Sequence, residues 1–372
     1  MKTRFVLIFF IYIVSQTQGN TILKEEPSLK NAMRGKFQIG VALNASQIFG
    51  RDTAGVKVVL KHFNAIVAEN SMKSASLLRS PDRYDFREAD AFVKFGLDND
   101  MTVIGHCLIW HSQLPDWFCV DDLGNNISAE ELKGRMEHHI KTVVGRYKGR
   151  VTGWDVVNEA IMEDGSYRKS KFYEILGEEF IPLAFQYAQE ADPNAQLYYN
   201  DYNEWYPEKR KTIVRLINTL KERDIRIDGV GMQAHVGMTS PSIKEYEETI
   251  REYSDAGVKV LITEFDLSPL PEPRRRGGAD LDDNETYKKQ IDPYTDGLPI
   301  DVMNNWNERM NDFFTMFINN SDNIIRVTMW GVSDGDSWLN NFPVKGRTNY
   351  PLLFDRNHKP KAIVTKLINN SL

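Results

Sequence analysis

The sequence predicts an α/β fold, a single (β/α)8 barrel, from three observations. Short apolar runs rich in Val and Ile alternate with amphipathic helical stretches from about residue 30 onward. The chain has 372 residues, and barrels of this kind commonly run from about 200 to over 400 residues. Polar and charged residues follow the apolar runs, as at the carboxyl ends of barrel strands. A doubly wound sheet is the structural alternative, but the chain lacks the glycine-rich phosphate loop that usually follows its first strand.

Eight apolar runs are the strand candidates, and each ends at a polar or aromatic residue or a small turn. In chain order they cover residues 37–42, 65–69, 102–110, 151–158, 196–200, 229–235, 258–264 and 325–330. The helix candidates between them include residues 128–146, 171–191, 208–223, 241–256, 304–317 and 361–367. Ser128 and Glu131 predict a capping box at the start of one helix. Pro241 suits the first turn of another helix.

The N-terminus predicts a secretory signal peptide over residues 1–19, followed by one catalytic domain over residues 20–372. Lys2 and Arg4 precede an unbroken apolar run over residues 5–14, and Thr17 and Gly19 follow it. A membrane anchor is the alternative, but it needs roughly 20 apolar residues, about twice this run. We therefore expect a secreted protein, extracellular or periplasmic, with no membrane anchor.

Charge and cysteine content narrow the possible partners. The formal net charge is −6 at pH 7 and becomes −8 without Lys2 and Arg4, so electrostatics offer no basis for nucleic-acid binding. Cys107 and Cys119 are the only cysteines. Secretion permits a disulfide between them, but Cys107 falls in a core strand candidate, which favours buried free thiols. Neither cysteine has metal-ligand spacing, and we expect no metal or cofactor.

A long connection over residues 267–298 follows the seventh strand and contains an Arg-rich and an Asp-rich stretch. Loops of this length are uncommon unless they have a function. A solvated surface loop is one interpretation of it. A flap that touches substrate is the other.

Two glutamates, Glu159 and Glu264, are the strongest functional signal. Each ends a short apolar, β-branched run, the fourth and the seventh strand candidates. A carboxylate at such a strand end can be held rigidly and partly desolvated, as acid, base or nucleophile chemistry requires. We expect the two side chains to face each other across the mouth of the barrel.

The other strand ends supply side chains that suit a sugar ligand. Amides and carboxylates bond to hydroxyl groups, and indole faces pack on the apolar faces of sugars. In strand order, these residues are Glu69, Asn70 and Lys73; His106, Trp110, His111 and Gln113; Asn158 and Glu159; Asn200, Asp201, Tyr202 and Asn203; Gln233 and His235; Glu264 and Asp266; Trp330 and Trp338.

Taken singly, several of these residues have a purely structural explanation. His106 and Trp110 share strand parity and would suit core filling. Glu69 and Lys73 would suit a local ion pair. Residues 138–139, both histidines, lie on a charged helix, where we expect a solvated face. The functional interpretation rests on all these residues sharing one end of the barrel.

The chain resembles the family 10 glycoside hydrolases, the retaining endo-β-1,4-xylanases, over about residues 35–368. The matching segments are ENSMK (69–73), GHCLIWHSQ (105–113), WDVVNE (154–159), NDYN (200–203), GMQAH (231–235), ITEFD (262–266), WGVSD (330–334) and PLLFD (351–355). The resemblance implies that Glu159 is the acid/base and Glu264 the nucleophile. It further implies that Asn158 holds the sugar 2-hydroxyl and that His235, bonded to Glu264 and Asp266, orients the nucleophile.

The resemblance also implies the substrate-binding residues. Lys73, His106, Gln233 and Trp330 would line the subsite of the attacked sugar, with Trp110 and Trp338 as its walls. Glu69, Asn70 and Gln113 would reach the next sugar on the non-reducing side, and Tyr202 would stack on the leaving-group side. Two positions depart from the family pattern. Ser74 replaces a usual tryptophan and Leu339 a common basic residue, so the shape of the glycone subsites is open.

The implied function is a secreted endo-1,4-β-xylanase that binds xylan and xylo-oligosaccharides and acts as a monomer. Retaining glycosidases hold their two carboxyl groups about 5–5.5 Å apart. Two like charges at this distance do not ionise together easily. We therefore expect Glu159 to keep its proton while Glu264 stays ionised.

Three other functions compete with this one. A serine esterase would use Ser333, in a literal G-x-S-x-G pattern, with Asp355 and His358, but residues 337–343 look like a loop and not the required helix. A metal-dependent hydrolase would use His106, His235 and Asp266, but it lacks an H-x-H motif on the first strand. A catalytically silent polysaccharide-binding protein would not need both glutamates.

Overall fold

The computed structural model describes residues 26–271 and 291–370. The predicted signal peptide, residues 1–19, lies outside these residues, as does most of the connection over residues 267–298. Among the described helices, none combines the length and apolar character that crossing a bilayer requires.

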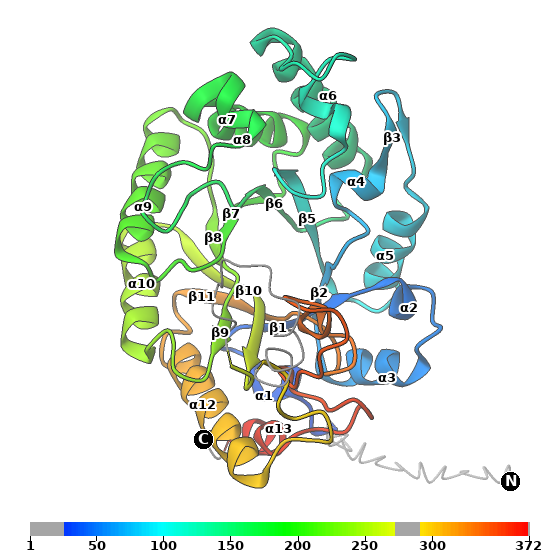
Figure 1. Ribbon diagram of the computed structural model, residues 1–372, viewed down its shortest axis with the longest axis vertical. Helices are drawn as coiled ribbons and strands as arrows, with labels where there is room; N and C mark the ends of the chain where they lie inside the picture. The colour runs from blue at the N-terminus through cyan, green and yellow to red at the C-terminus, as the bar shows by residue number, and fades with distance from the viewer. Residues whose placement is uncertain (1–25, 272–290, 371–372) are drawn as a thin grey trace, which may run out of the picture.

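Eight parallel strands form a closed barrel, which confirms the predicted fold class. Each strand pairs with the next along the chain, and the last pairs with the first, where Gln38 lies opposite Arg326. Figure 1 shows this ring of strands with the helices around it. The strands are β1 Gln38–Leu43, β2 Ala65–Ala68, β5 Thr102–Trp110, β6 Gly153–Asn158, β7 Gln196–Asp201, β8 Gly229–Met232, β10 Lys259–Ser268 and β11 Ile324–Met329.

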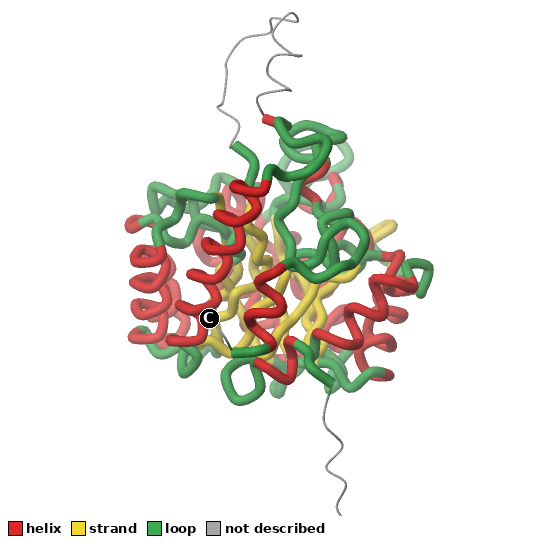
Figure 2. The backbone as a smooth tube through the Cα atoms, turned by 90° about the horizontal axis from the view of Figure 1, so that it is seen from below, coloured by secondary structure: helices red, strands yellow, loops and turns green. Residues whose placement is uncertain are grey.

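Helices form the outer layer, and the side view shows loops gathered beyond the ends of the strands (Figure 2). The α-helices are α1 Leu29–Ala32, α2 Ala45–Ile48, α3 Thr53–His62, α4 Ser74–Leu77, α5 Arg87–Asp98, α6 Ala129–Arg146, α7 Lys171–Leu176, α8 Phe180–Ala191, α9 Pro207–Glu222, α10 Ile243–Asp255, α12 Ile300–Asn319 and α13 Ala362–Ile368. Short 3-10 turns are η1 Asp116–Cys119, η2 Gly177–Glu179 and η4 Trp338–Asn340, and three minor strands are β3 Leu78–Ser80, β4 Arg83–Tyr84 and β9 His235–Gly237.

Four local expectations were wrong. The helix predicted over residues 171–191 is broken at Gly177, whose φ of 59° is a left-handed value that ends α7. Pro241 precedes the N-cap of α10, which is Ser242. The strand predicted over residues 229–235 is split into β8 and β9, and β9 pairs with the outer part of β10 and extends that strand to Ser268. At α6 only half of the capping box forms, because the Glu131 carboxylate bonds Arg135.

The core has two parts. Inside the barrel, a small cluster of side chains includes Ile104, Tyr198, Leu261 and Trp330. A much larger cluster fills the space between the strands and the outer helices. Cys107 and Cys119 are both buried and unbridged, as the sequence favoured.

One arginine holds the two described stems of the connection that follows β10. Arg347 is buried, and it donates from Nε to the Ile291 carbonyl at 2.7 Å and from Nη2 to the Pro271 carbonyl at 2.8 Å. On the Ile291 side, Thr348 N donates to Asp292 Oδ1 at 3.0 Å. The stems are therefore fixed to the loop that precedes Tyr350.

Candidate active site

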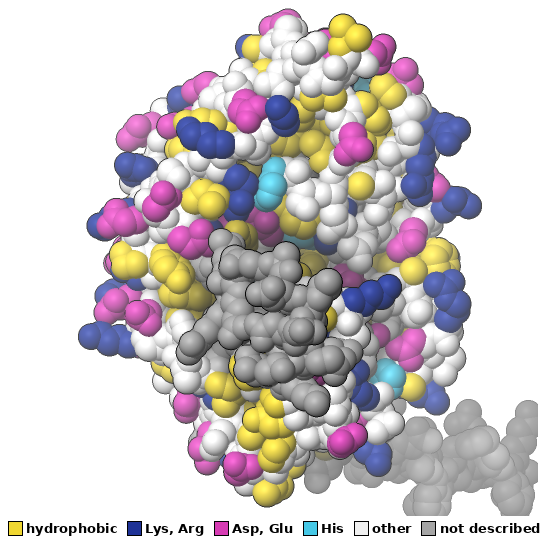
Figure 3. Space-filling view, in the orientation of Figure 1, with side chains coloured by type: hydrophobic (Ala, Val, Ile, Leu, Met, Phe, Trp, Pro, Cys, Tyr) yellow, Lys and Arg dark blue, Asp and Glu magenta, His cyan; other side chains and the backbone are white. Residues whose placement is uncertain are grey.

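The carboxyl ends of β6 and β10 carry the two glutamates at the same end of the barrel. Glu159 directly follows β6, and Glu264 lies within β10 beside a shift in register. Glu159 has a φ of 58°, in the left-handed region that non-glycine residues seldom occupy, and such conformations cluster at functional sites. The space-filling view of this end shows acidic, basic and histidine side chains gathered near its middle (Figure 3).

A continuous chain of amide hydrogen bonds joins the two glutamates. Gln233 Nε2 donates to Glu159 Oε1 at 3.0 Å and to Asn158 Oδ1 at 3.3 Å. Asn200 Nδ2 donates to the same Asn158 oxygen at 2.9 Å and to Glu264 Oε1 at 2.8 Å. The side chains of Asn158, Asn200 and Gln233 are buried. The two carboxylates are therefore held in one rigid network across β6, β7, β8 and β10.

Glu264 lies in a cationic environment. His235 Nε2 is 3.2 Å from Glu264 Oε2, and His235 Nδ1 is 3.0 Å from Asp266 Oδ2. Burial alone would raise the pKa of Glu264, but the hydrogen bond from His235 and the charges of His106, His235 and Lys73 outweigh it. The pKa of Glu264 is therefore lowered, and the carboxylate stays ionised, as a nucleophile requires.

His235 in turn is held charged by the two carboxylates beside it. Burial disfavours its charged form, but Asp266 first, and then Glu264, raise its pKa to about 10. Trp338 Nε1 donates to the same Asp266 oxygen at 2.9 Å, and the Trp338 ring packs edge-on against His235 at 5.0 Å between ring centroids. These contacts fix the imidazole against the glutamate.

The carboxyl group of Glu159 receives its hydrogen bonds from neutral groups. Trp110 Nε1 donates to Glu159 Oε2 at 2.9 Å, and the Gln233 amide occupies the other oxygen. Arg168 Nε donates to the Glu159 backbone carbonyl at 2.8 Å, and Arg168 Nη2 donates to the Tyr202 hydroxyl at 2.8 Å. The two glutamates therefore differ in their partners: the Glu264 carboxylate bonds a charged histidine, and the Glu159 carboxyl group accepts from neutral donors.

The residues at the ends of β2 and β5 extend the site beside Trp110. Lys73 Nζ donates to Asn70 Oδ1 at 3.1 Å and lies 5.1 Å from the centroid of the Trp110 ring. Asn70 Nδ2 donates to Glu69 Oε1 at 3.1 Å. Burial raises the pKa of Glu69, and the positive charge of Lys73 partly offsets this rise. Lys73 is thus part of a hydrogen-bonded row and not an isolated surface charge.

His106 lies at the bottom of the site. Its Nδ1 is 2.9 Å from Asp155 Oδ2, and both side chains are buried. The imidazole ring packs edge-on against the Trp330 ring, with 5.4 Å between the ring centroids, and its centroid lies 6.4 Å from that of the Trp110 ring. Gln113 differs from the others because its side chain is exposed, while its backbone carbonyl accepts from Ala75 N at 2.8 Å.

Three residues for which the sequence predicts no role belong to the site: Asn200 and Arg168 contact the glutamates, and Asp155 contacts His106. Asn200 was named only as a strand end, and it bridges Asn158 and Glu264. Asp155 pairs with His106, and it lies level with Tyr198 of the inner cluster. A register shift between Asp155 and Val157 interrupts the strand alternation that could have predicted this inward position. Arg168 lies nine residues beyond Glu159, and no sequence pattern marks it.

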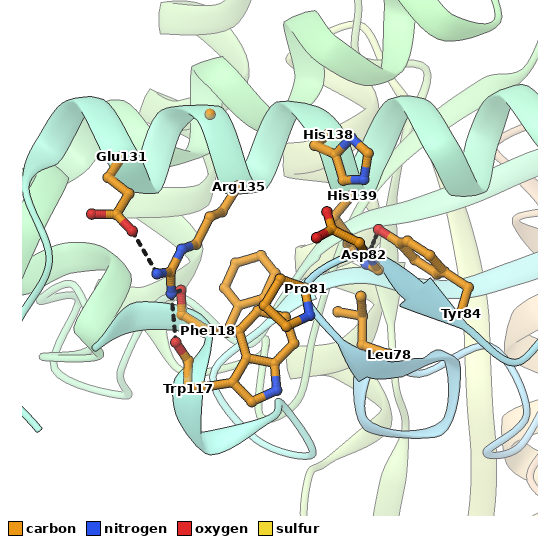
Figure 4. A pocket seen from close by; sticks show the side chains of 11 residues that line it. Leu78, Pro81, Asp82, Tyr84, Trp117, Phe118, Glu131, Arg135, His138 and His139 are labelled. Carbon is orange, nitrogen blue, oxygen red and sulfur yellow. Dashed lines mark hydrogen bonds and ion pairs between the residues drawn. The ribbon is translucent and has the colours of Figure 1, made fainter. Parts of the chain in front are cut away.

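The expectation of a solvated face at residues 138–139 was wrong for His139. This side chain is buried, with Nε2 3.2 Å from Ser74 Oγ and Nδ1 3.4 Å from the Tyr84 hydroxyl. Figure 4 shows the hollow beside it, which Trp117, Tyr84 and His138 line. Ser74 Oγ also donates to the Leu108 carbonyl at 3.3 Å. Ser74 is therefore buried in a contact between α4 and α6, with no bond to the glutamate network.

The constellation expected of a serine esterase is not assembled. Ser333 Oγ is buried and donates to Asp336 Oδ2 at 2.8 Å. His358 Nε2 is 3.5 Å from Asp52 Oδ2. The histidine and the serine therefore bond to different carboxylates, neither of which is Asp355.

Comparison with known proteins agrees with this geometry. The model of glycosyl hydrolase family 10 matches residues 28–370. Endo-1,4-beta-xylanase A of Xylanibacter ruminicola is 46% identical over 93% of this chain and 94% of its own length. An endo-1,4-beta-xylanase of Geobacillus stearothermophilus is 38% identical over 92% and 98%.

Two solved structures show the same likeness in three dimensions. A GH10 endoxylanase from a sugarcane soil metagenome superposes with a TM-score of 0.86 and 42% identity, covering 93% of this chain and 100% of that one. Xylanase XynB from Paenibacillus barcinonensis, complexed with a conduramine derivative, superposes with a TM-score of 0.83 and 36% identity, covering 93% and 99%.

The charge on His235 predicts how stability depends on pH. Its pKa is raised from 6.5 to about 10 in the folded protein, so its contribution is fully present below pH 6.5 and is lost as pH rises toward 10. We expect His235→Asn to lose most stability at pH 6 and progressively less toward pH 10, measured by urea unfolding.

His62→Asn is the matched control with the opposite sign. Burial lowers the pKa of His62 from 6.5 to about 4, so this histidine destabilises the fold as pH falls from 6.5 toward 4. Removing it should flatten the acid side of the stability curve. Identical pH profiles for the two variants would contradict the assignment of charge to His235.

Proposed function

This chain belongs to glycosyl hydrolase family 10 and is an endo-1,4-β-xylanase, and from this premise we propose that it cleaves xylan with net retention at the anomeric carbon. The observation that carries the proposal is the amide network that ties Glu159 and Glu264 together at one end of the barrel. Retaining glycosidases use two carboxyl groups close enough for direct attack on the sugar.

Glu264 acts as the nucleophile in the proposed mechanism. Its carboxylate attacks the anomeric carbon and forms a covalent glycosyl-enzyme ester as the glycosidic bond breaks. The lowered pKa of Glu264 keeps the carboxylate ionised at neutral pH. His235 and Asn200 each bond one of its oxygens, which leaves the carboxylate little freedom to turn.

Glu159 acts first as acid and then as base. Its proton passes to the departing oxygen while Glu264 attacks, and the leaving sugar departs as an alcohol. The deprotonated Glu159 then takes a proton from water, which attacks the anomeric carbon and releases Glu264. The Trp110 and Gln233 bonds hold the carboxyl group in place for both steps.

The surrounding side chains bind the sugars on either side of the scissile bond. Asn158 holds the 2-hydroxyl group of the attacked sugar, beside Lys73, His106, Gln233, Trp330 and the two walls Trp110 and Trp338. Glu69, Asn70 and Gln113 serve the next sugar on the non-reducing side. Tyr202 stacks on the leaving-group side, where Arg168 holds its hydroxyl group. Internal cleavage follows from the presence of sugar-binding groups on both sides.

Secretion is also part of the proposal, with the apolar run over residues 5–14 and the basic residues before it as support. Expression of the whole chain with its own N-terminus should release mature protein into the periplasm or the medium. N-terminal sequencing should then find a first residue near position 20. Full-length protein recovered from the cytoplasm alone would refute this part.

The stereochemistry of the first product tests the retaining mechanism. We expect proton NMR of a xylo-oligosaccharide digest to show the β-anomer first, with the α-anomer growing later by mutarotation. The reason is that two successive displacements restore the original configuration. If the α-anomer appears first, the covalent mechanism is wrong.

Removal of either glutamate tests the separate roles. We expect Glu264→Ala to lose turnover by about 1,000-fold or more, because no covalent step remains. Glu159→Ala should lose about 100- to 10,000-fold on xylan but far less on an aryl xylobioside, whose leaving group needs no protonation.

Azide distinguishes the two variants by the product that each forms with the aryl substrate. Glu159→Ala should give the β-glycosyl azide and Glu264→Ala the α-glycosyl azide, because azide replaces water in one case and the nucleophile in the other. Glu174→Ala, which alters a surface carboxylate paired with Lys171, is the control for mutation and purification. Equal azide products from both glutamate variants would reverse or remove the assignments.

A further inference from the structure

Glu204, a buried residue outside the proposed catalytic set, accepts a hydrogen bond from the backbone of Gln233. Glu204 lies in the turn between β7 and α9, and its side chain is fully buried. Glu204 Oε1 accepts from the backbone N–H of Gln233 at 2.6 Å. The same N–H also points to the Asp201 carbonyl at 2.9 Å. A side chain thus adds a second acceptor to a peptide group that the neighbouring strand already bonds.

Gln233 is the residue through which this contact reaches both glutamates. Its side chain donates to Glu159 Oε1 at 3.0 Å, and its backbone carbonyl accepts from Glu264 N at 3.0 Å. It lies just past the end of β8, where Ala234 has a left-handed φ of 63°. The backbone leaves regular strand geometry directly after Gln233, so an added restraint on the Gln233 peptide has a structural purpose.

We propose, on the basis of the retaining mechanism above, that Glu204 is a positioning residue. Its carboxyl group fixes the Gln233 peptide, and through Gln233 it sets the relative positions of Glu159 and Glu264. It touches neither substrate nor a reacting atom. Displacement of reacting groups by about 1 Å can cost on the order of 100-fold in rate.

The surroundings of Glu204 explain why a carboxyl group can be held there. The Asp201 carboxylate on β7 pairs with Lys209 on α9 at 2.8 Å, and both side chains are fully buried. Tyr246 and Tyr253 face the cluster from α10, and Tyr253 donates to the Glu204 backbone carbonyl at 3.5 Å. Lys209 pairs with Asp201, and Glu204 forms no ion pair with any residue that the structure describes.

Burial without a paired cation favours the neutral form of Glu204. Burial, which is the largest cause, raises its pKa to about 8, against the opposing effects of Lys209 and the Gln233 N–H. A neutral acid keeps Oε1 as an acceptor and avoids the cost of a buried charge. The function inferred for Glu204 requires the acceptor atom at its position and not the charge.

Three substitutions test this inference through their order of effect. Glu204→Gln keeps an oxygen acceptor of the same reach, and we expect kcat within about threefold of wild type. Glu204→Asp withdraws the acceptor by one methylene group, and Glu204→Leu removes it. We expect kcat to fall about 10-fold and about 100-fold respectively, with KM changed less than threefold, because ground-state sugar contacts remain.

Asp192→Leu is the matched control. Asp192 is a buried carboxylate at the opposite end of β7 and accepts from Gly149 N and Asn194 N, each at 3.0 Å. Its loss should lower the melting temperature with kcat unchanged. If Glu204→Leu and Asp192→Leu both lower stability and both keep kcat, Glu204 is structural only and the proposal is wrong.

The Gln and Asp variants decide the question even if Glu204→Leu does not fold. A Gln variant as slow as the Asp variant would overturn the proposal, because it would assign the role to the charge. The pH profile of kcat adds an independent readout. Displacement of Gln233 removes a donor from Glu159, so we expect the profile to change in Glu204→Asp and to stay that of wild type in Asp192→Leu. Release of xylo-oligosaccharides by the wild-type enzyme tests the proposed function, whereas the order of the Glu204 variants tests the positioning role. Failure of either proposal can therefore be told from failure of the other.

Discussion

Parallel register around the closed barrel is the constraint on which every contact of the active site depends. Asn158 on β6 lies level with Asn200 on β7, and Asn200 lies level with Gly231 on β8. The amide of Asn200 can span from Asn158 to Glu264 only because these residues reach the same height. A slip of one residue in any strand would turn its side chains to the other face. Because β11 pairs with β10 as well as with β1, each of the eight barrel strands is held on both sides.

The barrel also gives chemically similar carboxyl groups different properties. The hydrogen bond from His235 and nearby positive charges lower the pKa of Glu264, whereas burial outweighs the lowering contacts of Glu69 and Glu204 and raises the pKa of both. Glu159 is held by an indole, an amide and its own strand-end geometry. Glycosidase chemistry needs two carboxyl groups in opposite protonation states. Here the side-chain partners of Glu264 and Glu159 differ because different neighbouring strands supply them.

Much of this arrangement could be predicted from sequence because strand ends are marked by a sharp change from apolar to polar residues. That change located Glu159, Glu264 and their neighbours at the same end of the barrel. What could not be predicted depends on contacts between distant segments. Arg168 and Glu204 act through backbone atoms, and a backbone contact leaves no pattern in the sequence. His139 was misjudged because its helix is charged, although the residue itself faces Ser74 and Tyr84.

Arg347 donates hydrogen bonds to the carbonyls of both Pro271 and Ile291. This pair of bonds has a consequence for how the sequences of related enzymes can diverge. One guanidinium bonds both ends of the connection, so these ends are held in place by the barrel side of the molecule and not by the sequence between them. We therefore expect changes of sequence between these two residues to leave the pairing of β10 and the start of α12 in place. Pro271 and Ile291 are therefore the natural borders for an exchange of sequence between related chains.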